Sequence, residues 1–300
     1  MKNSSRQLNT IFAVAEEKIK NKGEDSLFYK ATDNKFILAA FDGCGGSGSK
    51  KYVNYSEKTG AYIASRAICG GIMSWFDESG KKETISEYTD KALSVCTKYA
   101  DKTSRIMGSL GKTFPTTLSV LTGELQNNKV NATCYWAGDS RCYILDAEGL
   151  HQLTDDDLDD QDAMSNLTSD GIMNNSINAS SSYKIHVRSL SFAQPSILFT
   201  ATDGCFGYYN SPMAFEYLLT ETLTRSSCML EWKKLLYDGM YSVAGDDFTL
   251  CAAVYGFQNF EDIRSTFAKR CRYVYDNYIN TAEDLNKLWD IYKPDYSKYL

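Results

Sequence analysis

The chain has 300 residues, of which 43% are hydrophobic, and this is enough for one large core. Its 32 lysine and arginine residues against 38 aspartate and glutamate residues give a net charge of −6 without any basic block, which argues against a nucleic-acid-binding protein. The longest apolar runs, such as residues 36–41, fall far short of the roughly 20 residues that a membrane-spanning helix needs. We therefore expect a soluble protein that binds neither nucleic acid nor a membrane.

The N-terminal residues 1–20 contain only a short apolar island, residues 11–15, followed by two glutamates, which is unlike a secretory signal. The nine cysteines form no C-x-x-C pair, and several lie within apolar runs. We expect reduced, mostly structural thiols, and the cytoplasm as the default compartment.

Residues 26–29 and 36–41 are the first predicted strands, because aromatic and branched side chains dominate both runs and a turn-rich segment separates them. The second strand ends directly at Asp42. Two amphipathic helices are expected next, since apolar residues recur at spacings of three and four over residues 61–75 and repeat the pattern over 85–99.

Residues 117–125, 130–137 and 142–145 are further predicted strands, and their short connections predict antiparallel neighbours. Residues 161–182 are polar and rich in asparagine and serine, with little periodicity. We expect them to form a long surface loop whose flexibility would gate a site.

Residues 197–202 and 248–255 are two more predicted strands, with helical spacing over residues 213–241 between them. Strands in hairpins combined with paired helices predict a layered α+β fold.

Beyond these strands, aromatic and charged residues alternate, with helices expected at about 261–278 and 282–292. We divide the chain into a main domain, residues 1–256, and a helical C-terminal extension, residues 257–300, to which no chemistry is assigned.

Three aspartates share a position at predicted strand ends. Asp42 and Asp203 each follow an apolar strand and precede a glycine, and Asp246 lies just before a third strand. Although Asp-Gly is also a common turn dipeptide, carboxylates fixed at strand ends suit Mg²⁺ or Mn²⁺, which prefer oxygen ligands. The combination of three predicts a metal site. With only two histidines and no suitable cysteine spacing, a zinc site is not expected.

Over about residues 20–256 the chain resembles the metal-dependent serine/threonine protein phosphatases, the PPM or type 2C family. The matching segments occur in the family's order, and they are Gly23-Glu24-Asp25-Ser26, Phe41-Asp42-Gly43-Cys44-Gly45-Gly46, Thr116-Thr117, Ala137-Gly138-Asp139-Ser140-Arg141, Leu153-Thr154-Asp155, Thr202-Asp203-Gly204 and Asp246-Asp247-Phe248-Thr249. The resemblance implies an α-β-β-α sandwich, in which pairs of helices flank two antiparallel β-sheets. It also implies hydrolysis of phosphoserine and phosphothreonine in proteins.

By this resemblance, Asp42 would bridge two Mg²⁺ or Mn²⁺ ions, and the Gly43 carbonyl would bind one of them. Asp203 and Asp246 would complete the other ion's site, so these three aspartates are the expected catalytic residues. The two ions would orient and acidify a water that attacks phosphorus in line.

Glu24 or Asp25 would serve the first ion, directly or through water. Asp139 lies where the aspartate of some members helps to hold a third, weaker ion. The family usually has an arginine for the substrate phosphate four residues before Glu24, and this chain has Lys20, which lacks the planar fork of arginine. Lys22 or a different arginine is the alternative phosphate-binding residue.

Two more positions depart from the family pattern. Cys44 occupies a position that is histidine in many eukaryotic members and commonly methionine in bacterial ones, and we expect its thiol simply to pack. Asp247 replaces the usual asparagine and adds a negative charge near the ions.

Other interpretations fit less well. Gly43, Gly45 and Gly48 form a G-x-G-x-x-G pattern, but the preceding Asp42 would place a carboxylate beside a dinucleotide's pyrophosphate. No P-loop and no cysteine-phosphatase spacing is present in the sequence. Six aspartates within residues 155–162 do not follow calcium-loop spacing, so a solvated acidic loop is expected.

The competing function is a phosphatase-like binding or regulatory module with weak or lost catalysis. The expected partner of the enzyme is a phosphorylated protein, and residues 257–300 offer a further partner contact.

Overall fold

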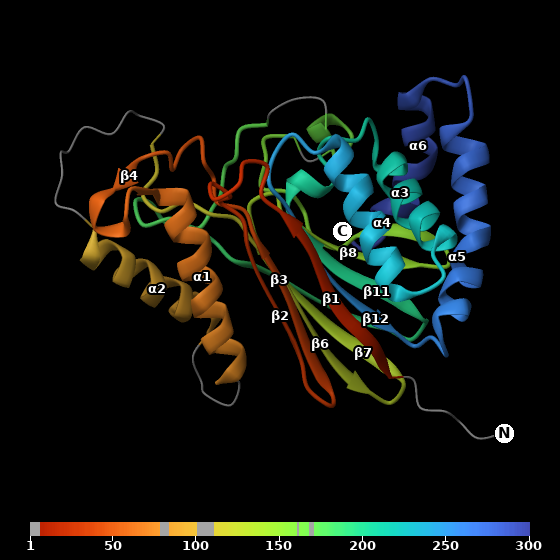
Figure 1. The fold of residues 1–300 in the computed structure, drawn as a ribbon, viewed down its shortest axis with the longest axis horizontal. Coiled ribbons are helices and arrows are strands. Elements are labelled where there is room, and N and C mark those ends of the chain that lie inside the picture. Colours follow the sequence, from red (N-terminus) through yellow and green to blue (C-terminus); the bar gives the residue numbers. More distant parts are fainter. Residues whose placement is uncertain (1–6, 79–83, 101–110, 161, 168–170) are drawn as a thin grey trace.

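The structure is a computed structural model that describes residues 7–78, 84–100, 111–160, 162–167 and 171–300 (Figure 1). Two predicted features lie partly outside the described residues. They are the N-terminal segment, predicted to be unlike a secretory signal, at residues 1–6, and the polar loop, at residues 161 and 168–170.

Two antiparallel five-stranded sheets form the centre of the described structure. The first sheet has the strand order β1 (Leu8–Glu16), β12 (Phe248–Tyr255), β11 (Ser196–Ala201), β8 (Arg141–Asp146) and β9 (Gly149–Gln152). The second has the order β10 (His186–Phe192), β7 (Lys129–Ala137), β6 (Leu118–Gln126), β3 (Lys35–Phe41) and β2 (Ser26–Ala31). A small ribbon of β4 (Lys51–Tyr52) and β5 (Lys58–Thr59) precedes the first helix.

Helices cover the outer face of each sheet, as Figure 1 shows. Helices α1 (Gly60–Asp77) and α2 (Ile85–Tyr99) pack on the second sheet. Helices α3 (Pro212–Arg225), α4 (Met229–Val243), α5 (Phe260–Val274) and α6 (Leu285–Tyr296) lie on the side of the first sheet. The predicted α-β-β-α sandwich is therefore confirmed.

Strand β3 explains why the central strands are continuous apolar runs. Ile37, Ala39 and Phe41 face α1 and α2, whereas Phe36 and Leu38 belong to the cluster between the two sheets. All five side chains are fully buried. Because successive side chains of a strand point to opposite faces, a strand covered on both faces must be apolar at every position.

One prediction about strand pairing is wrong. β6 and β7 are antiparallel neighbours, but β7 and β8 belong to different sheets although only Gly138, Asp139 and Ser140 separate them. Gly138 has a φ of +96°, which glycine adopts without strain. The turn therefore carries the chain from one layer to the other and places Asp139 between the ends of the two sheets.

The polar segment after β9 is also less exposed than predicted. Ser176, Ile177 and Asn178 are buried, and Ile177 forms an antiparallel bridge with Thr116. The backbone N–H of each of these two residues donates to the other's carbonyl oxygen, at 3.0 and 2.9 Å. This part of the loop is thus fixed to the end of the second sheet.

The C-terminal helices share a core with the first sheet. Phe267 of α5 and Trp289 of α6 belong to the same hydrophobic cluster as Leu250 of β12. Glu216 of α3 is 0% exposed and accepts hydrogen bonds from the Arg270 side chain of α5 at 2.6 and 3.0 Å.

Among the described helices, none combines the length and hydrophobicity that crossing a membrane requires.

Candidate metal centre

The predicted site residues lie at one end of both sheets. Asp42 directly follows β3, and Asp25 directly precedes β2, whose first residue is paired with the last residue of β3. Asp203 follows β11, and Asp246 lies two residues before β12, at the end where Ala201 pairs with Leu250. Antiparallel pairing thus brings residues far apart in the sequence to one edge of the sandwich.

Two threonines hold the backbone of Asp42. Thr117 Oγ1 accepts a hydrogen bond from the Asp42 N–H at 3.0 Å, and the Thr117 N–H donates to the Asp42 carbonyl oxygen at 2.8 Å. The Thr116 hydroxyl donates to the same carbonyl at 2.7 Å. Thr117 Oγ1 also lies 2.7 Å from Ser140 Oγ, next to Asp139. The threonine pair therefore fixes the position of Asp42 relative to the turn that carries Asp139.

A third threonine links the two sheets at Asp25. Thr202 Oγ1 donates to Asp25 Oδ2 at 2.9 Å, and it accepts a hydrogen bond from the Thr249 N–H at 2.9 Å. Thr202 directly precedes Asp203, so the position of Asp25 is coupled to that of a second candidate ligand.

The glycines of the site allow close backbone approach. A Cβ added to Gly204 would lie 1.8 Å from the carbonyl oxygen of Asp247. A Cβ on Gly43 would lie 2.8 Å from the Glu24 carbonyl oxygen, and one on Gly45 would lie 2.2 Å from Glu24 Oε2. A larger residue would displace Glu24 or Asp247, so these glycines contribute to the geometry of the carboxylates.

The candidate ligands affect one another's ionisation. Burial raises the pKa of Asp42 well above its usual range, and the charges of Asp203 and Asp25 raise it further. Burial raises the pKa of Asp25 to about 8, against the opposing hydrogen bonds of two threonines. Burial and then the charge of Asp246 raise the pKa of Asp203 to about 6. Like charges held this close disfavour the ionised forms.

Asp139 and Glu24 belong to the same electrostatic cluster. Burial, followed by the charge of Asp203, raises the pKa of Asp139 to about 8. Burial also raises the pKa of Glu24, with the charges of Asp247 and Asp246 adding to it and a hydrogen bond from the Thr59 hydroxyl opposing it. The structure therefore brings together all the acidic residues that the sequence predicted for the site.

The residues present fit divalent cations. Asp139 Oδ1 is buried and, within the described part of the chain, has no hydrogen-bond partner. A buried carboxylate oxygen without a donor is costly unless a cation satisfies it. The candidate ligands are all carboxylate or carbonyl oxygens, which suits Mg²⁺ and Mn²⁺.

The predicted phosphate-binding lysines lie on the connection between β1 and β2. Both Lys20 and Lys22 are exposed, and Lys22 lines a cavity of about 410 Å³ together with Glu24. Lys112 was not predicted from the sequence, and its ammonium donates to Ser176 Oγ at 2.9 Å.

The environment of Cys44 connects Lys112 to the site. Burial raises the pKa of the Cys44 thiol well above its usual value, the charges of Asp42 and Asp139 add to this effect, and the charge of Lys112 opposes it. A thiol with a raised pKa is a poor acid, which agrees with the expectation that Cys44 packs. The charges of Lys112, Asp42 and Asp139 thus all act on Cys44.

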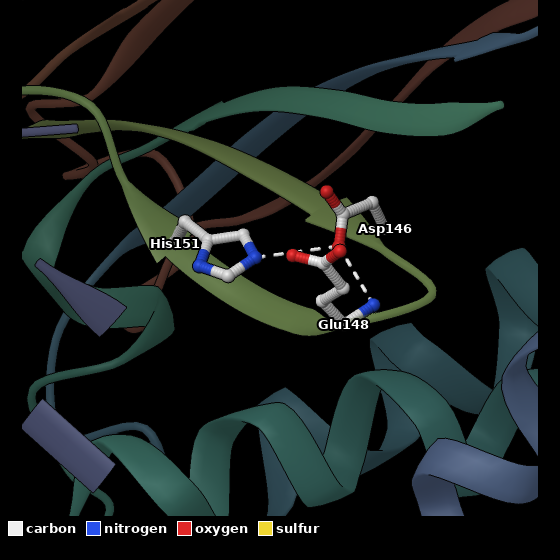
Figure 2. A group of neighbouring side chains, drawn as sticks. All are labelled: Asp146, Glu148 and His151. Carbon is white, nitrogen blue, oxygen red and sulfur yellow. Dashed lines mark hydrogen bonds and ion pairs between the residues drawn. The ribbon is translucent and has the colours of Figure 1, made fainter. Parts of the chain in front are cut away.

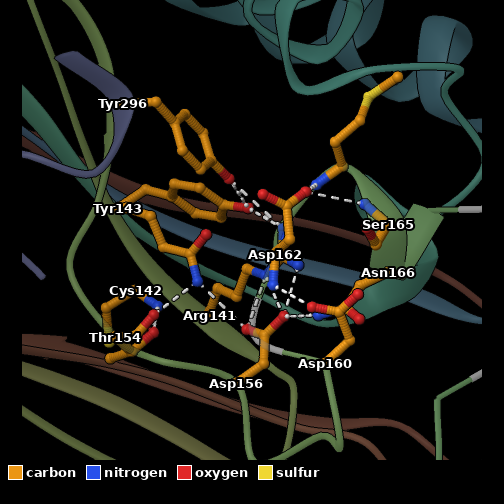
Figure 3. Close-up of polar contacts among 12 residues, drawn as sticks. Arg141, Cys142, Tyr143, Thr154, Asp156, Asp160, Asp162, Ser165, Asn166 and Tyr296 are labelled. Carbon is orange, nitrogen blue, oxygen red and sulfur yellow. Dashed lines mark hydrogen bonds and ion pairs between the residues drawn. The ribbon is translucent and has the colours of Figure 1, made fainter. Parts of the chain in front are cut away.

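Arg141 is an unexpected buried charge beside the site (Figure 3). It is 2% exposed, and its Nε lies 2.9 Å and its Nη2 2.5 Å from the two carboxylate oxygens of Asp156. Asp156 is itself 5% exposed, so the expectation of a solvated acidic loop is wrong at this residue. The spacing of the aspartates could not indicate this pairing, because the partner lies on β8 and not in the acidic segment.

A cavity of about 440 Å³ lies between the candidate ligands and the acidic segment. Asp139 and Asp203 line it on the side of the sheets, and Asp156, Asn166 and Leu167 line it as well. This cavity therefore borders two of the candidate metal ligands.

A second group of possible ligands, Asp146, Glu148 and His151, lies at the far end of β8 and β9 (Figure 2). His151 Nδ1 lies 2.6 Å from the Asp295 carbonyl oxygen, and its Nε2 lies 3.3 Å from Asp146 Oδ1. Burial acts to raise the pKa of Asp146, but His151 lowers it below its usual value. Lys298 donates to Glu148 at 2.7 Å. Since each member has a protein partner, the group fastens the C-terminus to this hairpin.

The sequence matches no protein-family model and no curated protein sequence. Several solved structures do match. The serine/threonine phosphatase Stp1 from Staphylococcus aureus has 14% identity and a TM-score of 0.60, over 83% of this chain and 96% of that chain. The Mycobacterium tuberculosis serine/threonine phosphatase PstP/Ppp has 14% identity and a TM-score of 0.57, over 82% and 98%. The catalytic domain of PstP in complex with two manganese ions has 14% identity and a TM-score of 0.54, over 83% and 99%.

The chain therefore has the fold of the PPM-type serine/threonine phosphatases. The resemblance drawn from its motifs is confirmed at the level of the fold.

Proposed function

We propose that the protein is a metal-dependent phosphatase that removes phosphate from phosphoserine and phosphothreonine in proteins. The convergence of Asp42, Asp139 and Asp203 at one edge of the sandwich supports this most strongly, because their raised pKa values make the cluster unfavourable without cations. The fold neighbours add support, since they are described as phosphatases and one holds two manganese ions.

In this proposal, Asp42, Asp203 and Asp246 are the main ligands of two Mg²⁺ or Mn²⁺ ions, and the Gly43 carbonyl, with Glu24 or Asp25, completes the first site. Asp139 contributes to a third, weaker site. When bound, the ions would activate a water towards phosphorus and offset charge on the phosphoryl oxygens.

The remaining residues position these groups. Thr116 and Thr117 hold the backbone of Asp42, so that its carboxylate keeps one place relative to Asp139. Lys112, together with the predicted Lys20 and Lys22, supplies positive charge for the substrate phosphate. The raised pKa of Cys44 leaves protonation of the leaving group to water.

The test is hydrolysis of para-nitrophenyl phosphate and of a phosphothreonine peptide by the full chain, with Mn²⁺, with Mg²⁺ and with chelator. We expect turnover that requires metal and that falls by orders of magnitude in Asp42→Ala and in Asp203→Asn, with the circular dichroism spectrum preserved. Metal-dependent turnover that persists in both variants would contradict the assignment of the site.

A phosphatase-like binding module is the second candidate. The observation in its favour is Lys20, which is exposed and lacks the fork of the family's phosphate-binding arginine. A module of this kind would bind a phosphopeptide without turning it over, under any metal tested.

The state of the cysteines bears on the cellular compartment of the protein. All nine cysteines lie in the described part of the chain and are free, and six of them are buried. A reducing compartment such as the cytoplasm, with phosphorylated proteins as partners, fits these thiols.

A further inference from the structure

Helix α6 contacts two separate parts of the polar network beside the cavity. Trp289 Nε1 donates to both carboxylate oxygens of Asp162, at 3.1 and 3.0 Å, and Lys293 Nζ lies 2.5 Å from Asp162 Oδ2. One turn further on, the Tyr296 hydroxyl accepts a hydrogen bond from Arg141 Nη1 at 3.4 Å. Figure 3 shows Tyr296 and Asp162 together with the Arg141 side chain.

Asp162 determines where the next short helix begins. Its Oδ1 accepts hydrogen bonds from the backbone N–H groups of Met164 and Ser165, at 3.0 and 3.1 Å. Its carbonyl oxygen accepts from the Asn166 N–H at 3.0 Å. It therefore caps the 3₁₀-helix η2 (Ser165–Leu167), two residues of which line the cavity.

The same short helix connects back to Arg141. Asn166 Nδ2 donates to Asp156 Oδ2 at 3.1 Å, and Asp156 is paired with Arg141. Hydrogen bonds thus run from Asp162 through Asn166 and Asp156 to Arg141, and α6 contacts both ends of this series.

The short helix needs support from outside itself. A 3₁₀-helix of three residues has few internal hydrogen bonds. In addition, Asn166 Oδ1 is buried and has no hydrogen-bond partner among the described residues, which disfavours its present position. The contacts of α6 with Asp162 compensate for the unfavourable position of Asn166. Trp289, which donates to Asp162, is itself held in place by burial, since it is 5% exposed.

We propose that α6 acts as a clasp for the substrate pocket, in which Trp289 and Lys293 are positioning residues that hold Asn166 and Leu167 in the cavity wall through Asp162. This rests on the proposed phosphatase function, because the cavity receives substrate only if Asp139 and Asp203 hold the catalytic ions. The clasp gives the C-terminal extension a direct effect on substrate binding without any contact to the ions.

The test compares the double variant Trp289→Phe/Lys293→Gln with Lys298→Gln, both in the full chain. Phenylalanine keeps most of the buried ring but removes the N–H donor, and glutamine removes the charge. Lys298 is the matched control, since it also pairs with a carboxylate, that of Glu148. Glu148 lies between β8 and β9, at the end of these strands away from the cavity. The first readout is hydrogen exchange at the Met164 and Ser165 amides.

We expect exchange at these amides to be at least about tenfold faster in the double variant than in Lys298→Gln, with exchange in β6 unchanged. The KM for a phosphothreonine peptide should rise about tenfold, or about 1.4 kcal/mol, while kcat and the Mn²⁺ requirement stay as in the wild type. A structural defect alone would lower kcat and speed exchange throughout the chain.

Two results would overturn the clasp. Unchanged exchange at Met164 and Ser165 refutes it whether or not the protein is a phosphatase, and faster exchange with an unchanged KM refutes its effect on the pocket. If the wild type is inactive under every metal, the proposed function fails and the exchange result alone decides whether α6 holds the wall.

Discussion

The carboxylate of Asp247 supports the backbone of Glu24, since Asp247 Oδ2 accepts a hydrogen bond from the Glu24 N–H at 2.7 Å. Its other oxygen accepts from the Lys18 N–H, also at 2.7 Å. The side chain thus fastens the connection between β1 and β2 to the start of β12, next to Asp246. The sequence alone indicates only a negative charge at this position.

Asp247→Asn, which restores the residue usual in the family, should therefore destabilise this protein. Asparagine has one acceptor oxygen, which is neutral, so one of the two backbone N–H groups loses its acceptor, which costs about 1–3 kcal/mol. Urea unfolding of the metal-free protein measures this loss. Equal or greater stability in the variant would show that the charge repulsion of Asp247 outweighs its hydrogen bonds.

Without divalent ions, the free energy of unfolding should decrease as the pH rises from about 4 to about 8. The folded-state pKa of Asp25 and of Asp139 is about 8, whereas an unfolded aspartate titrates near pH 3.9. The folded state therefore binds more protons than the unfolded state across this window. The stability that these two groups contribute is fully present below the unfolded pKa and is lost as the pH rises through the folded pKa.

Mn²⁺ should reverse this decrease of the unfolding free energy with rising pH, because it binds the ionised carboxylates. Thermal unfolding with Mn²⁺ and with chelator should give a difference in Tm that is larger at about pH 8 than at about pH 5. Asp42→Asn is the comparison variant, and its Tm difference between Mn²⁺ and chelator should be smaller. An equal effect of Mn²⁺ at both pH values would argue against a cation site among these aspartates.

Gly204→Ala should reduce stability by about 1–3 kcal/mol, because the added methyl group would collide with the Asp247 carbonyl at 1.8 Å. Gly46→Ala is the matched control in the same part of the site, since nothing lies within 4 Å of its added Cβ. We expect the control to stay within about 0.5 kcal/mol of the wild type. Similar unfolding free energies for the two variants would mean that the backbone around Gly204 adjusts.

Lys112→Met should raise the KM for a phosphopeptide about tenfold, which corresponds to losing about 1.4 kcal/mol of phosphate binding. Its charge acts on Cys44, as do the charges of Asp42 and Asp139, whereas Lys20 is exposed, so Lys20→Met should have a smaller effect. Lys129→Met, at an exposed position where β7 begins, serves as the control. If Lys20→Met has the larger effect, the phosphate binds as the family resemblance implies.

The layers of the fold could be predicted because their elements carry strong local signals. β3 and β12 are continuous apolar runs, and α2 begins with a capping box formed by Thr84 and Glu87. β10 could not be predicted, because it is an edge strand whose half-buried side chains include His186 and Arg188 and whose exposed ones include the apolar Val187. β9 has only four residues, too few for a period to show.

The candidate site was predictable in its acidic members, since each lies at a strand end within a recognisable motif. Lys112 and the Arg141–Asp156 pair were not, because their positions depend on contacts between distant segments that have no sequence period. The crossing of the chain between the sheets at Gly138 was hidden for a similar reason, as a three-residue connection is most often a hairpin.

The pairing of Glu216 makes residues 257–300 part of the main core. The carboxylate is 0% exposed, and it is bonded by the guanidinium of Arg270 and the hydroxyl of Tyr292, which both lie in this segment. Removing one partner of a buried ion pair in the intact chain costs about 3–5 kcal/mol, a large part of a typical domain's stability. A single substitution at Arg270 would therefore act on the stability of the whole domain, and residues 257–300 do not behave as a detachable tail.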